Sequence, residues 1–375
     1  MAAYARMSMQ KKWQLSCHAD LVVVGAGMCG VSFARHAAEA GKRVVLLEAN
    51  LVGSGMTGSS AGHVMTGFYP SPAQMISKIG AIETLRLQRW SHESKLALRS
   101  RWIDLGLGDS ITDGYLLVAR TGDEREVLED IAAYWCDQLG VAGVRIIAGS
   151  SLAGWIRSPT VDSALYDPSG FRIDPPTLVK GLRRLASHEL IDVQERTKVL
   201  RVSTAGERHR VETTLGMIMT DQVVLCTGAN QVELLGCMEE PAIGLTTTVV
   251  AITEPIPRDV LRETLPFQIA GSDCSHAPDY WTPLRDGRLL FGCSETTPAK
   301  SLSNTEKLIR VRYQQLFPRL AGYEFKHVYS AFVDQSDTGL PETRMLASGC
   351  HISTGYSGVG LATSYGAGKQ HFERV

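Results

Sequence analysis

The sequence of 375 residues lacks an excess of charge of either sign, because 38 lysines and arginines stand against 39 aspartates and glutamates. The formal net charge of −1 gives no electrostatic reason to expect nucleic acid or an anionic membrane as a partner. No apolar run reaches the ~18 residues that a membrane span needs. The first 19 residues also lack an apolar stretch of signal-peptide length. These absences predict a cytoplasmic protein and leave its oligomeric state open.

The eight cysteines form no C-x-x-C pair, and the chain contains no internal repeat or low-complexity tract. Several cysteines lie in apolar segments, so we expect buried, reduced thiols rather than disulfides or a zinc site, and no metal is predicted. Hydrophobic residues make up 44% of the chain and charged residues 21%, which is ordinary for a globular enzyme; the length predicts two structural domains. The cysteines are Cys17, Cys29, Cys136, Cys226, Cys237, Cys274, Cys293 and Cys350.

A glycine-rich turn follows the first strongly apolar segment. Residues 21–24 (LVVV) suit a central parallel strand that is buried on both faces. Gly25, Gly27 and Gly30 follow in G-x-G-x-x-G spacing, and residues 28–40 have the alanine-rich composition of a helix. In a dinucleotide-binding turn the first glycine permits the bend, the second lets the backbone approach the pyrophosphate, and the third allows close helix–strand packing. The N–H groups at the helix start would face the phosphates.

A second strand and an acidic residue support this interpretation. Residues 42–49 have the pattern of a second strand. Glu48 lies near its end, 18 residues beyond Gly30. That spacing is close to the one expected of the acid that binds a ribose hydroxyl. An acid at this position also disfavours NADP, whose extra phosphate is accommodated by arginine. A plain strand–helix–strand turn that binds no ligand is the alternative left open.

The segment after Glu48, residues 51–64 (LVGSGMTGSSAGHV), is rich in glycine and small polar residues. A flexible linker would have the same composition. The segment stands, however, where the chain would cross the pyrophosphate and reach a flavin ring. Small residues there would let backbone amides face the cofactor closely.

A second glycine turn lies near the other end of the chain. Residues 350–353 suit a buried strand and lead into residues 355–360 (GYSGVG), which have the pattern of a turn and a helix start. We expect the chain to return here to the nucleotide held by residues 25–30. Such a return favours FAD over a nicotinamide, because FAD usually stays bound while its ring is built into the protein.

Between these two turns the chain alternates helical and strand-like segments, and it becomes β-rich in its second half. We predict an α/β fold in which a Rossmann-like FAD-binding domain carries an inserted α+β substrate domain with an antiparallel sheet. The predicted boundaries are residues 18–85, 150–235 and 335–375 for the discontinuous FAD-binding domain, and residues 86–149 and 236–334 for the substrate domain.

Local patterns place the remaining elements. Residues 163–171 have the chemistry of a turn around Asp167-Pro168. Residues 222–225 form an apolar strand that stops at Thr227-Gly228, where backbone could lie beside the nucleotide. Further helices are expected over 84–105, 123–139, 177–187 and 305–317, and further strands over 114–119, 193–202, 206–219, 245–253, 279–283 and 288–292.

With these segments in order, the sequence resembles the D-amino acid oxidase superfamily of FAD-dependent amine oxidases. Within it the likeness is greatest to gamma-glutamylputrescine oxidase and its glycine oxidase and sarcosine oxidase relatives, and it runs over residues 19–369. Each matching segment alone is unspecific, and six in the right order are specific. They are VVVGAGMCG, LLEA, GSGMTGSSAGHV, VVLCTGA, DYWTPLRDGRLLFG and GYSGVGLATSYGAGK.

The resemblance implies an FAD site assembled from both ends of the chain. The first glycine turn and Glu48 would hold the adenosine and phosphates, Val199 would meet the adenine through its backbone, and the last turn would lie against the isoalloxazine. The implied cofactor-binding residues are Gly25, Ala26, Gly27, Gly30, Glu48, Ala49, Gly55, Ser59, Ser60, Ala61, Gly62, His63, Val199, Thr227, Gly228, Gly355, Tyr356, Ser357, Gly358, Val359 and Gly360.

Three segments depart from the pattern of these relatives. Residues 280–282 (YWT) stand where Tyr-Tyr-Arg is frequent, so recognition of a charged substrate by that arginine is not implied. Residues 292–294 (GCS) replace three glycines, and residues 329–331 (YSA) replace Trp-Thr-Gly. The sequence also ends at Val375, earlier than those relatives do.

The implied reaction is oxidation of the carbon–nitrogen bond of a small amine or amino acid. Hydride would pass to the flavin N5, the imine would hydrolyse, and oxygen, giving peroxide, or another acceptor would take the electrons. Two alternatives remain: an FAD-dependent monooxygenase, and a flavin-binding partner subunit without amine oxidase activity. Residues 355–358 (GYSG) differ from the G-D-x-x-H pattern of the monooxygenases.

Four side chains are candidate catalytic residues. His63 could bond the flavin, position the substrate or hold a covalent link; it could also pack in a polar crevice without a catalytic role. Tyr356 is expected to face the active site. Tyr280 and Trp281 could form a wall of the substrate pocket, although aromatic residues in an alternating strand commonly belong to the core. The helix start at residues 358–360 is expected to stabilise negative charge on the reduced flavin.

Overall fold

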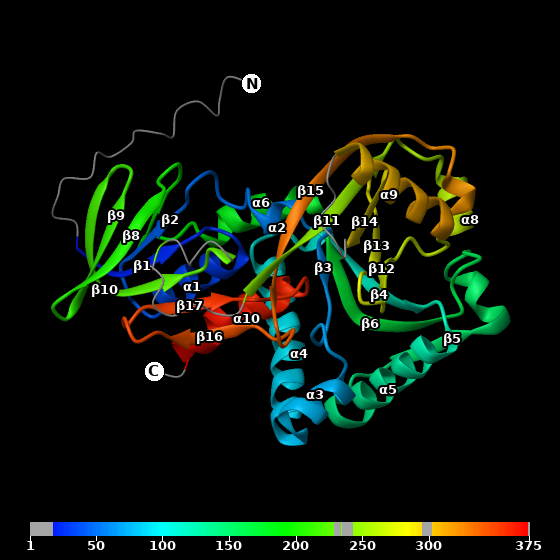
Figure 1. Cartoon of the computed structure of the whole chain (residues 1–375), viewed down its shortest axis with the longest axis horizontal. Coiled ribbons are helices and arrows are strands. Elements are labelled where there is room, and N and C mark those ends of the chain that lie inside the picture. Colours follow the sequence, from blue (N-terminus) through cyan, green and yellow to red (C-terminus); the bar gives the residue numbers. More distant parts are fainter. Residues whose placement is uncertain (1–17, 229–233, 235–242, 295–301, 374–375) are drawn as a thin grey trace.

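The computed structural model describes residues 18–228, 234, 243–294 and 302–373, and these residues form two β-sheets with helices packed against them (Figure 1). Cys17, Cys237 and the first residues of the chain lie outside the described part. Within that part, no helix combines the length and apolar character needed to cross a bilayer. The described residues also contain no group of three or more His, Cys, Asp or Glu side chains that could hold a metal ion.

The first sheet has a parallel centre, in the order β16-β17-β10-β1-β2-β7, which β9 and β8 extend as an antiparallel hairpin. Leu21 and Val23 of β1 pack in one apolar cluster and Val22 and Val24 in another, so both faces of this strand are buried, as the LVVV run predicts. The strands are β1 (His18–Val24), β2 (Val44–Leu47), β7 (Ile191–Gln194), β8 (Val199–Ala205), β9 (Arg208–Thr213), β10 (Gly216–Leu225), β16 (Glu342–Met345) and β17 (His351–Thr354).

The second sheet is mostly antiparallel, in the order β15-β11-β14-β13-β12-β4-β6-β3, with β5 beside β6. One pair, β12 with β4, is parallel, and the other pairs of this sheet are antiparallel, in keeping with the predicted antiparallel sheet. Its strands are β3 (His63–Val64), β4 (Ile111–Ala119), β5 (Arg145–Ala148), β6 (Ser163–Ile173), β11 (Ile243–Thr253), β12 (Ala270–Asp273), β13 (Asp279–Pro283), β14 (Leu289–Ser294) and β15 (Phe325–Ser336).

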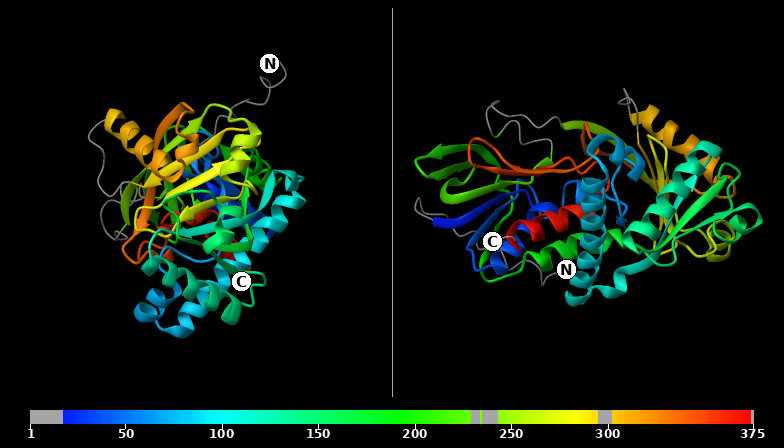
Figure 2. Two further views of the ribbon diagram at one scale, coloured as in Figure 1. Left: turned by 90° about the vertical axis from the view of Figure 1, so that its right-hand side faces the viewer. Right: turned by 90° about the horizontal axis from the view of Figure 1, so that it is seen from below.

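Helices from distant parts of the sequence pack together beside the first sheet. The first and last described α-helices, α1 and α10, contact each other, and α4 packs against α10 (Figure 2). Ser32 in α1 donates a hydrogen bond of 2.7 Å to the carbonyl oxygen of Tyr365 in α10. The α-helices are α1 (Met28–Glu39), α2 (Met56–Ser59), α3 (Pro72–Ile79), α4 (Ala81–Asp104), α5 (Gly122–Leu139), α6 (Pro175–Leu185), α8 (Arg258–Thr264), α9 (Leu302–Leu316) and α10 (Gly360–Glu373); the short 3₁₀ helices are η1 (Gly108–Ser110), η2 (Gly149–Gly154) and η4 (Pro318–Leu320).

Two expectations from the sequence are corrected by β6. Residues 163–171 were expected to form a turn, but they belong to this strand, because Pro168 stands at an irregularity in the β4–β6 pairing where a missing N–H is tolerated. The prediction also assigned residues 150–235 to the FAD-binding domain. Since β6 pairs with β4, residues 163–173 belong to the second sheet instead.

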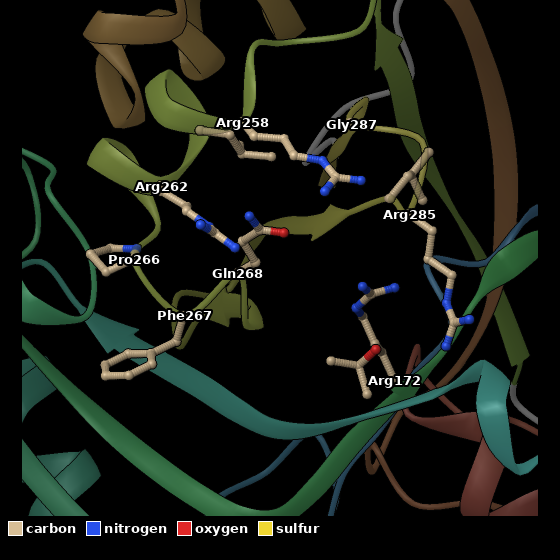
Figure 3. A pocket seen from close by; sticks show the side chains of 11 residues that line it. Arg172, Arg258, Arg262, Pro266, Phe267, Gln268, Arg285 and Gly287 are labelled. Carbon is tan, nitrogen blue, oxygen red and sulfur yellow. The ribbon is translucent and has the colours of Figure 1, made fainter.

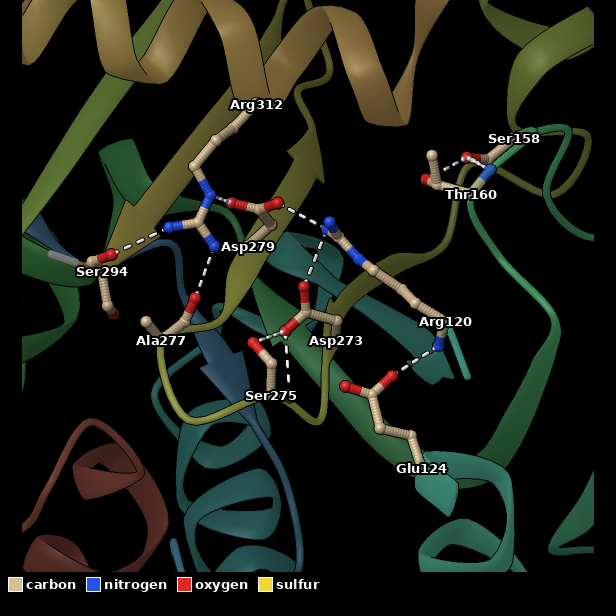
Figure 4. A network of polar contacts seen from close by, with 10 residues as sticks. All are labelled: Arg120, Glu124, Ser158, Thr160, Asp273, Ser275, Ala277, Asp279, Ser294 and Arg312. Carbon is tan, nitrogen blue, oxygen red and sulfur yellow. Dashed lines mark hydrogen bonds and ion pairs between the residues drawn. The ribbon is translucent and has the colours of Figure 1, made fainter. Parts of the chain in front are cut away.

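A buried network of charges connects α9 to the end of the second sheet (Figure 4). Asp279 is fully buried and lies 2.6 Å from Arg312 of α9 and 2.5 Å from Arg120, which follows β4. Arg120 also lies 2.8 Å from Asp273, whose carboxylate accepts hydrogen bonds from Ser275. Because removing one member of a buried ionic network leaves an unpaired charge, the network fixes this end of the sheet.

Candidate active site

The first glycine turn contains two packed glycines and one open glycine. Gly25 has φ +97°, and a Cβ there would lie 2.5 Å from the carbonyl oxygen of Cys226; a Cβ on Gly30 would clash with the carbonyl oxygen of Gly25. A Cβ on Gly27 would meet only the Thr57 hydroxyl, at 3.2 Å. Gly27 is also the N-cap of α1, with no side-chain cap. Backbone at Gly27 therefore leaves room for a ligand at the start of a helix, as a pyrophosphate cradle requires.

Polar groups around this turn also fit a nucleotide. Glu48, at the end of β2, accepts hydrogen bonds of 2.9 Å from Ala26 N–H and 2.8 Å from Asn50 N–H. The hydroxyl of Thr227 is buried and has no hydrogen-bond partner among the described residues. A buried hydroxyl without a partner costs free energy, so it marks a position where a ligand could supply one. Gly228, with φ +59°, follows it in the turn.

The glycine-rich segment after Glu48 connects the two sheets. A Cβ on Gly62, which has φ +78°, would clash with the carbonyl oxygen of Ile173 in β6. The hydroxyls of Ser59 and Ser60 bond to carbonyl groups of their own segment, and Ala61 packs in an apolar cluster with Leu284 of the second sheet. Two other candidates lie in or beside this segment: Ala49 is exposed after β2, and Gly55 is the N-cap of α2. Val199, far away in the sequence, begins β8 with a buried side chain.

The second glycine turn is held by a residue that the sequence did not point to, Asp334 of β15. Its buried carboxylate accepts hydrogen bonds of 2.7 Å from Gly355 N–H and 3.1 Å from the Thr354 hydroxyl. Its carbonyl oxygen accepts a bond of 2.9 Å from Ser357 N–H. Gly355 and Gly358 have φ +74° and +84°, so they suit glycine, and Val359 and Gly360 then lead into α10.

The two glycine turns meet, as the sequence predicted. Tyr356 lies with its hydroxyl 3.4 Å from the sulfur of Cys29 and 2.6 Å from the Ser353 hydroxyl. The sulfur of Cys29 is in turn 3.1 Å from that of Cys226, and both cysteines are free. The Tyr356 phenol is buried in the core between the two turns, and its exposure to the active site stays a prediction.

His63 of β3 is the centre of a polar cluster whose members come from strands of the second sheet. Its Nε2 lies 2.8 Å from the Thr282 hydroxyl and 3.2 Å from the carbonyl oxygen of Trp281, and its Nδ1 lies 3.2 Å from the Tyr115 hydroxyl. Because a carbonyl oxygen can only accept, Nε2 carries the proton in its contact with Trp281. Burial lowers the pKa of His63 to about 3, with a further contribution from the positive charge of Arg172, so the ring is neutral near pH 7.

Two tyrosines complete this cluster. The ring of Tyr280 stands edge-on to His63 at a centroid distance of 6.1 Å, and its hydroxyl lies 2.8 Å from that of Thr248. Tyr115 also contacts the Ser272 hydroxyl at 2.9 Å. Burial raises the pKa of both phenols above its ordinary value, so both keep their protons at neutral pH. A Cβ on Gly292 would clash with the Tyr280 ring, which explains a glycine at that position.

Trp281 lies on the opposite side of β13 from Tyr280. Its indole is fully buried, donates a hydrogen bond of 3.1 Å to the carbonyl oxygen of Ile269, and packs edge-on against Phe317. The prediction of a catalytic Trp281 side chain is therefore corrected: only its backbone carbonyl reaches His63. Neighbouring residues of a strand point to opposite faces, and the sequence did not reveal which of the two faced the site.

Comparison with known proteins places these features in a family. A family model described as FAD dependent oxidoreductase matches residues 20–374. The sequence is 26% identical over 358 residues to gamma-glutamylputrescine oxidoreductase of Escherichia coli (strain K12), covering 93% of this chain and 82% of that protein. It is also 26% identical over 338 residues to glycine oxidase of Geobacillus kaustophilus (strain HTA426), covering 86% and 83%.

Solved structures share the fold. Glycine oxidase from Geobacillus kaustophilus matches with a TM-score of 0.76 at 20% identity, covering 96% of this chain and 95% of that one. L-proline dehydrogenase from P. horikoshii matches with a TM-score of 0.77 at 19% identity, covering 95% and 92%. L-alpha-glycerophosphate oxidase from Mycoplasma pneumoniae, solved with FAD bound, gives 0.73 at 14% identity, covering 96% of each chain. At such identities the likeness establishes the fold alone, and it confirms the predicted fold class.

Proposed function

Because the chain belongs to the family of FAD dependent oxidoreductases, we propose that it oxidises the carbon–nitrogen bond of an amine or amino acid and that oxygen accepts the electrons. The related gamma-glutamylputrescine oxidoreductase and glycine oxidase support an amine or amino acid as the substrate. The observation on which the proposal rests is the junction of the two glycine turns, where the Tyr356 hydroxyl lies 3.4 Å from the sulfur of Cys29.

The residues at this junction fit FAD. The pyrophosphate would approach the backbone at Gly27 and the start of α1, and the ribose would meet Glu48. The hydroxyl of Thr227 would gain the partner that it lacks among the described residues. The second turn, held by Asp334, would present its backbone and the start of α10 to the ring. When bound, FAD supplies a hydride acceptor for the carbon beside the amine.

The protein's own part in the reaction would be to bind and orient the amine. Neutral His63 directs its Nε2 proton to Thr282 and the carbonyl of Trp281, so it positions these groups rather than removing a proton from the substrate. Tyr115 and Tyr280 stay protonated and can donate hydrogen bonds. Their rings pack edge-on against His63, at centroid distances of 5.1 Å for Tyr115 and 6.1 Å for Tyr280. An amine that binds in its neutral form needs no strong base, and the imine product would hydrolyse in water.

Purified protein should be yellow and contain one FAD per chain. Under anaerobic conditions a productive amine or amino acid should bleach the flavin, and readmitted oxygen should restore the colour and yield peroxide. Bleaching by NADPH, with no response to any amine, would point to a monooxygenase instead. A protein that holds FAD but responds to neither reagent would contradict the proposed activity and favour a non-catalytic flavin-binding subunit.

A further inference from the structure

A cavity of about 460 Å³ in the second sheet is lined by four arginines (Figure 3). Arg172 comes from β6, Arg258 and Arg262 from α8, and Arg285 from the turn between β13 and β14. The volume is within the range of small-molecule pockets. The lining residues include no acidic side chain; they are Thr112, Arg172, Arg258, Leu261, Arg262, Pro266, Phe267, Gln268, Leu284, Arg285 and Gly287.

Arg172 is a buried cation whose hydrogen-bonding capacity is largely unused. The residue is 5% exposed, and its Nε and Nη1 atoms have no hydrogen-bond partner among the described residues. The ion pair that the structure gives it, from Nη1 to Asp174, is long at 3.9 Å. A guanidinium in this situation is costly, because its desolvation is not offset by hydrogen bonds. Burial accordingly lowers the pKa of Arg172 to about 10, which still leaves it cationic at pH 7.

The other three arginines increase the positive charge at the rim. Arg258, Arg262 and Arg285 are exposed, and none of them forms an ion pair with another described residue. Arginines at other positions commonly form ion pairs; Arg319 of η4, for example, pairs with Glu263 of α8. In a protein of net charge −1, four arginines whose one ion pair within the described residues, Arg172 with Asp174, is long form a local site for an anion.

The pocket is next to the His63 cluster. In the sheet, Arg172 is the cross-strand partner of His63 on β3 and of Thr112 on β4, so the three residues form one row across adjacent strands. Directly opposed residues in antiparallel strands point to the same face. Leu284, which also lines the pocket, packs in a cluster with Ala61, two residues before His63. An extended ligand could therefore reach both places.

We propose that this arginine pocket binds an acidic group of the substrate, so that the enzyme acts on amines that carry a carboxylate or phosphate at their other end. Arg172 forms the floor of this subsite and the rim arginines attract the anion. This inference rests on the proposed amine oxidation.

A first experiment tests the pocket without turnover. The purified holoprotein is titrated calorimetrically at low salt with succinate, inorganic phosphate and the neutral succinamide. We expect the two anions to bind, succinamide to bind at least about tenfold more weakly, and Arg172→Met to weaken the anions by about tenfold or more. Arg172→Lys should restore part of the affinity. Arg201→Met, which removes an exposed arginine on β8, is the matched control and should bind like the wild type. Equal binding of succinate and succinamide, or no effect of Arg172→Met, would overturn the site.

A second experiment tests the connection to catalysis. Matched amines that end in a carboxylate, a phosphate or a carboxamide are compared by kcat/KM, for example 4-aminobutanoate, 3-aminopropyl phosphate and 4-aminobutanamide. We expect kcat/KM for at least one acidic amine to exceed that for the carboxamide by about tenfold or more, mainly through a lower KM. The Arg172→Met variant should reduce this difference. Whichever of the two acids, carboxylate or phosphate, gives the higher kcat/KM is the group that the pocket recognises. Turnover without any acid preference would refute the subsite and leave amine oxidation standing. Anion binding without turnover of any amine would refute the proposed function and the substrate assignment, while retaining the anion site.

Discussion

The hydroxyl of Tyr115 lies 3.2 Å from Nδ1 of His63, although the two residues belong to different strands and are 52 positions apart. Replacing this phenol tests whether the orientation of the imidazole matters. For Tyr115→Phe we expect about a tenfold loss of kcat/KM and about 1 kcal/mol of unfolding free energy, because one buried hydrogen-bond partner is removed. FAD content should not change. Steady-state kinetics and urea unfolding measure the two effects, with Tyr134→Phe on α5 as the control. Unaltered kinetics would show that Tyr115 has a packing role only.

The low pKa of His63 makes stability depend on pH in acid. Its pKa is about 3 in the folded protein, against about 6.5 in an unfolded chain. The unfolded state therefore takes up a proton first, and stability is lost as the pH falls below 6.5. Between pH 7 and 4.5 the wild type should lose about 2–3 kcal/mol more than His63→Gln, which cannot titrate. Urea unfolding at both pH values measures this. The exposed His327→Gln should keep the wild-type dependence; an identical dependence in His63→Gln would show that the ring is already charged or titrates elsewhere.

Gly27 and Gly30 should respond differently to the same methyl group. At Gly27 the backbone angles suit alanine and the Cβ meets only the Thr57 hydroxyl, so Gly27→Ala should change apoprotein stability by no more than about 1 kcal/mol. It should nevertheless weaken FAD binding by at least about tenfold, because the methyl stands where the pyrophosphate approaches. Gly30→Ala should cost about 3 kcal/mol or more, because its methyl clashes with the Gly25 carbonyl. FAD titration of the apoprotein and urea unfolding separate the two effects; normal FAD affinity in Gly27→Ala would contradict the cradle.

The contrast between predicted and unpredicted residues has a physical cause. Gly25, Gly30 and Glu48 were assigned from spacing, because a strand, a turn and a helix next to one another in sequence fix their geometry locally. Arg172 and Tyr115 could not be assigned, because their approach to His63 depends on which strands pair in the second sheet.

Two errors have the same origin. Pro168 indicated a turn, but a proline is also tolerated at an irregularity within a strand, which only the pairing of β6 reveals. Trp281 was predicted to line the substrate pocket together with Tyr280, yet neighbouring residues of a strand point to opposite faces of the sheet. Nothing in the local sequence pattern determines which of the two faces the pocket.

Asp334 provides a test of how the second glycine turn is held. Burial raises the pKa of this carboxyl above its ordinary value, so the folded state keeps the proton longer than the unfolded state. Its ionised form therefore destabilises the fold, and this loss develops as the pH rises through the folded pKa. Asp334→Asn retains an acceptor for Gly355 N–H without the charge. We expect this variant to unfold at an equal or higher urea concentration than the wild type, with the difference growing from pH 4 to pH 8.

Asp334→Ala, by contrast, leaves the buried N–H of Gly355 and the hydroxyl of Thr354 without their acceptor. It should cost about 1–3 kcal/mol at every pH, because the penalty arises from unmade hydrogen bonds rather than from charge. FAD affinity should fall with it, since the turn from Gly355 to Gly358 would no longer be held in its left-handed conformation. Equal losses in the asparagine and alanine variants at all pH values would mean that the negative charge itself, and not an acceptor oxygen, holds the turn.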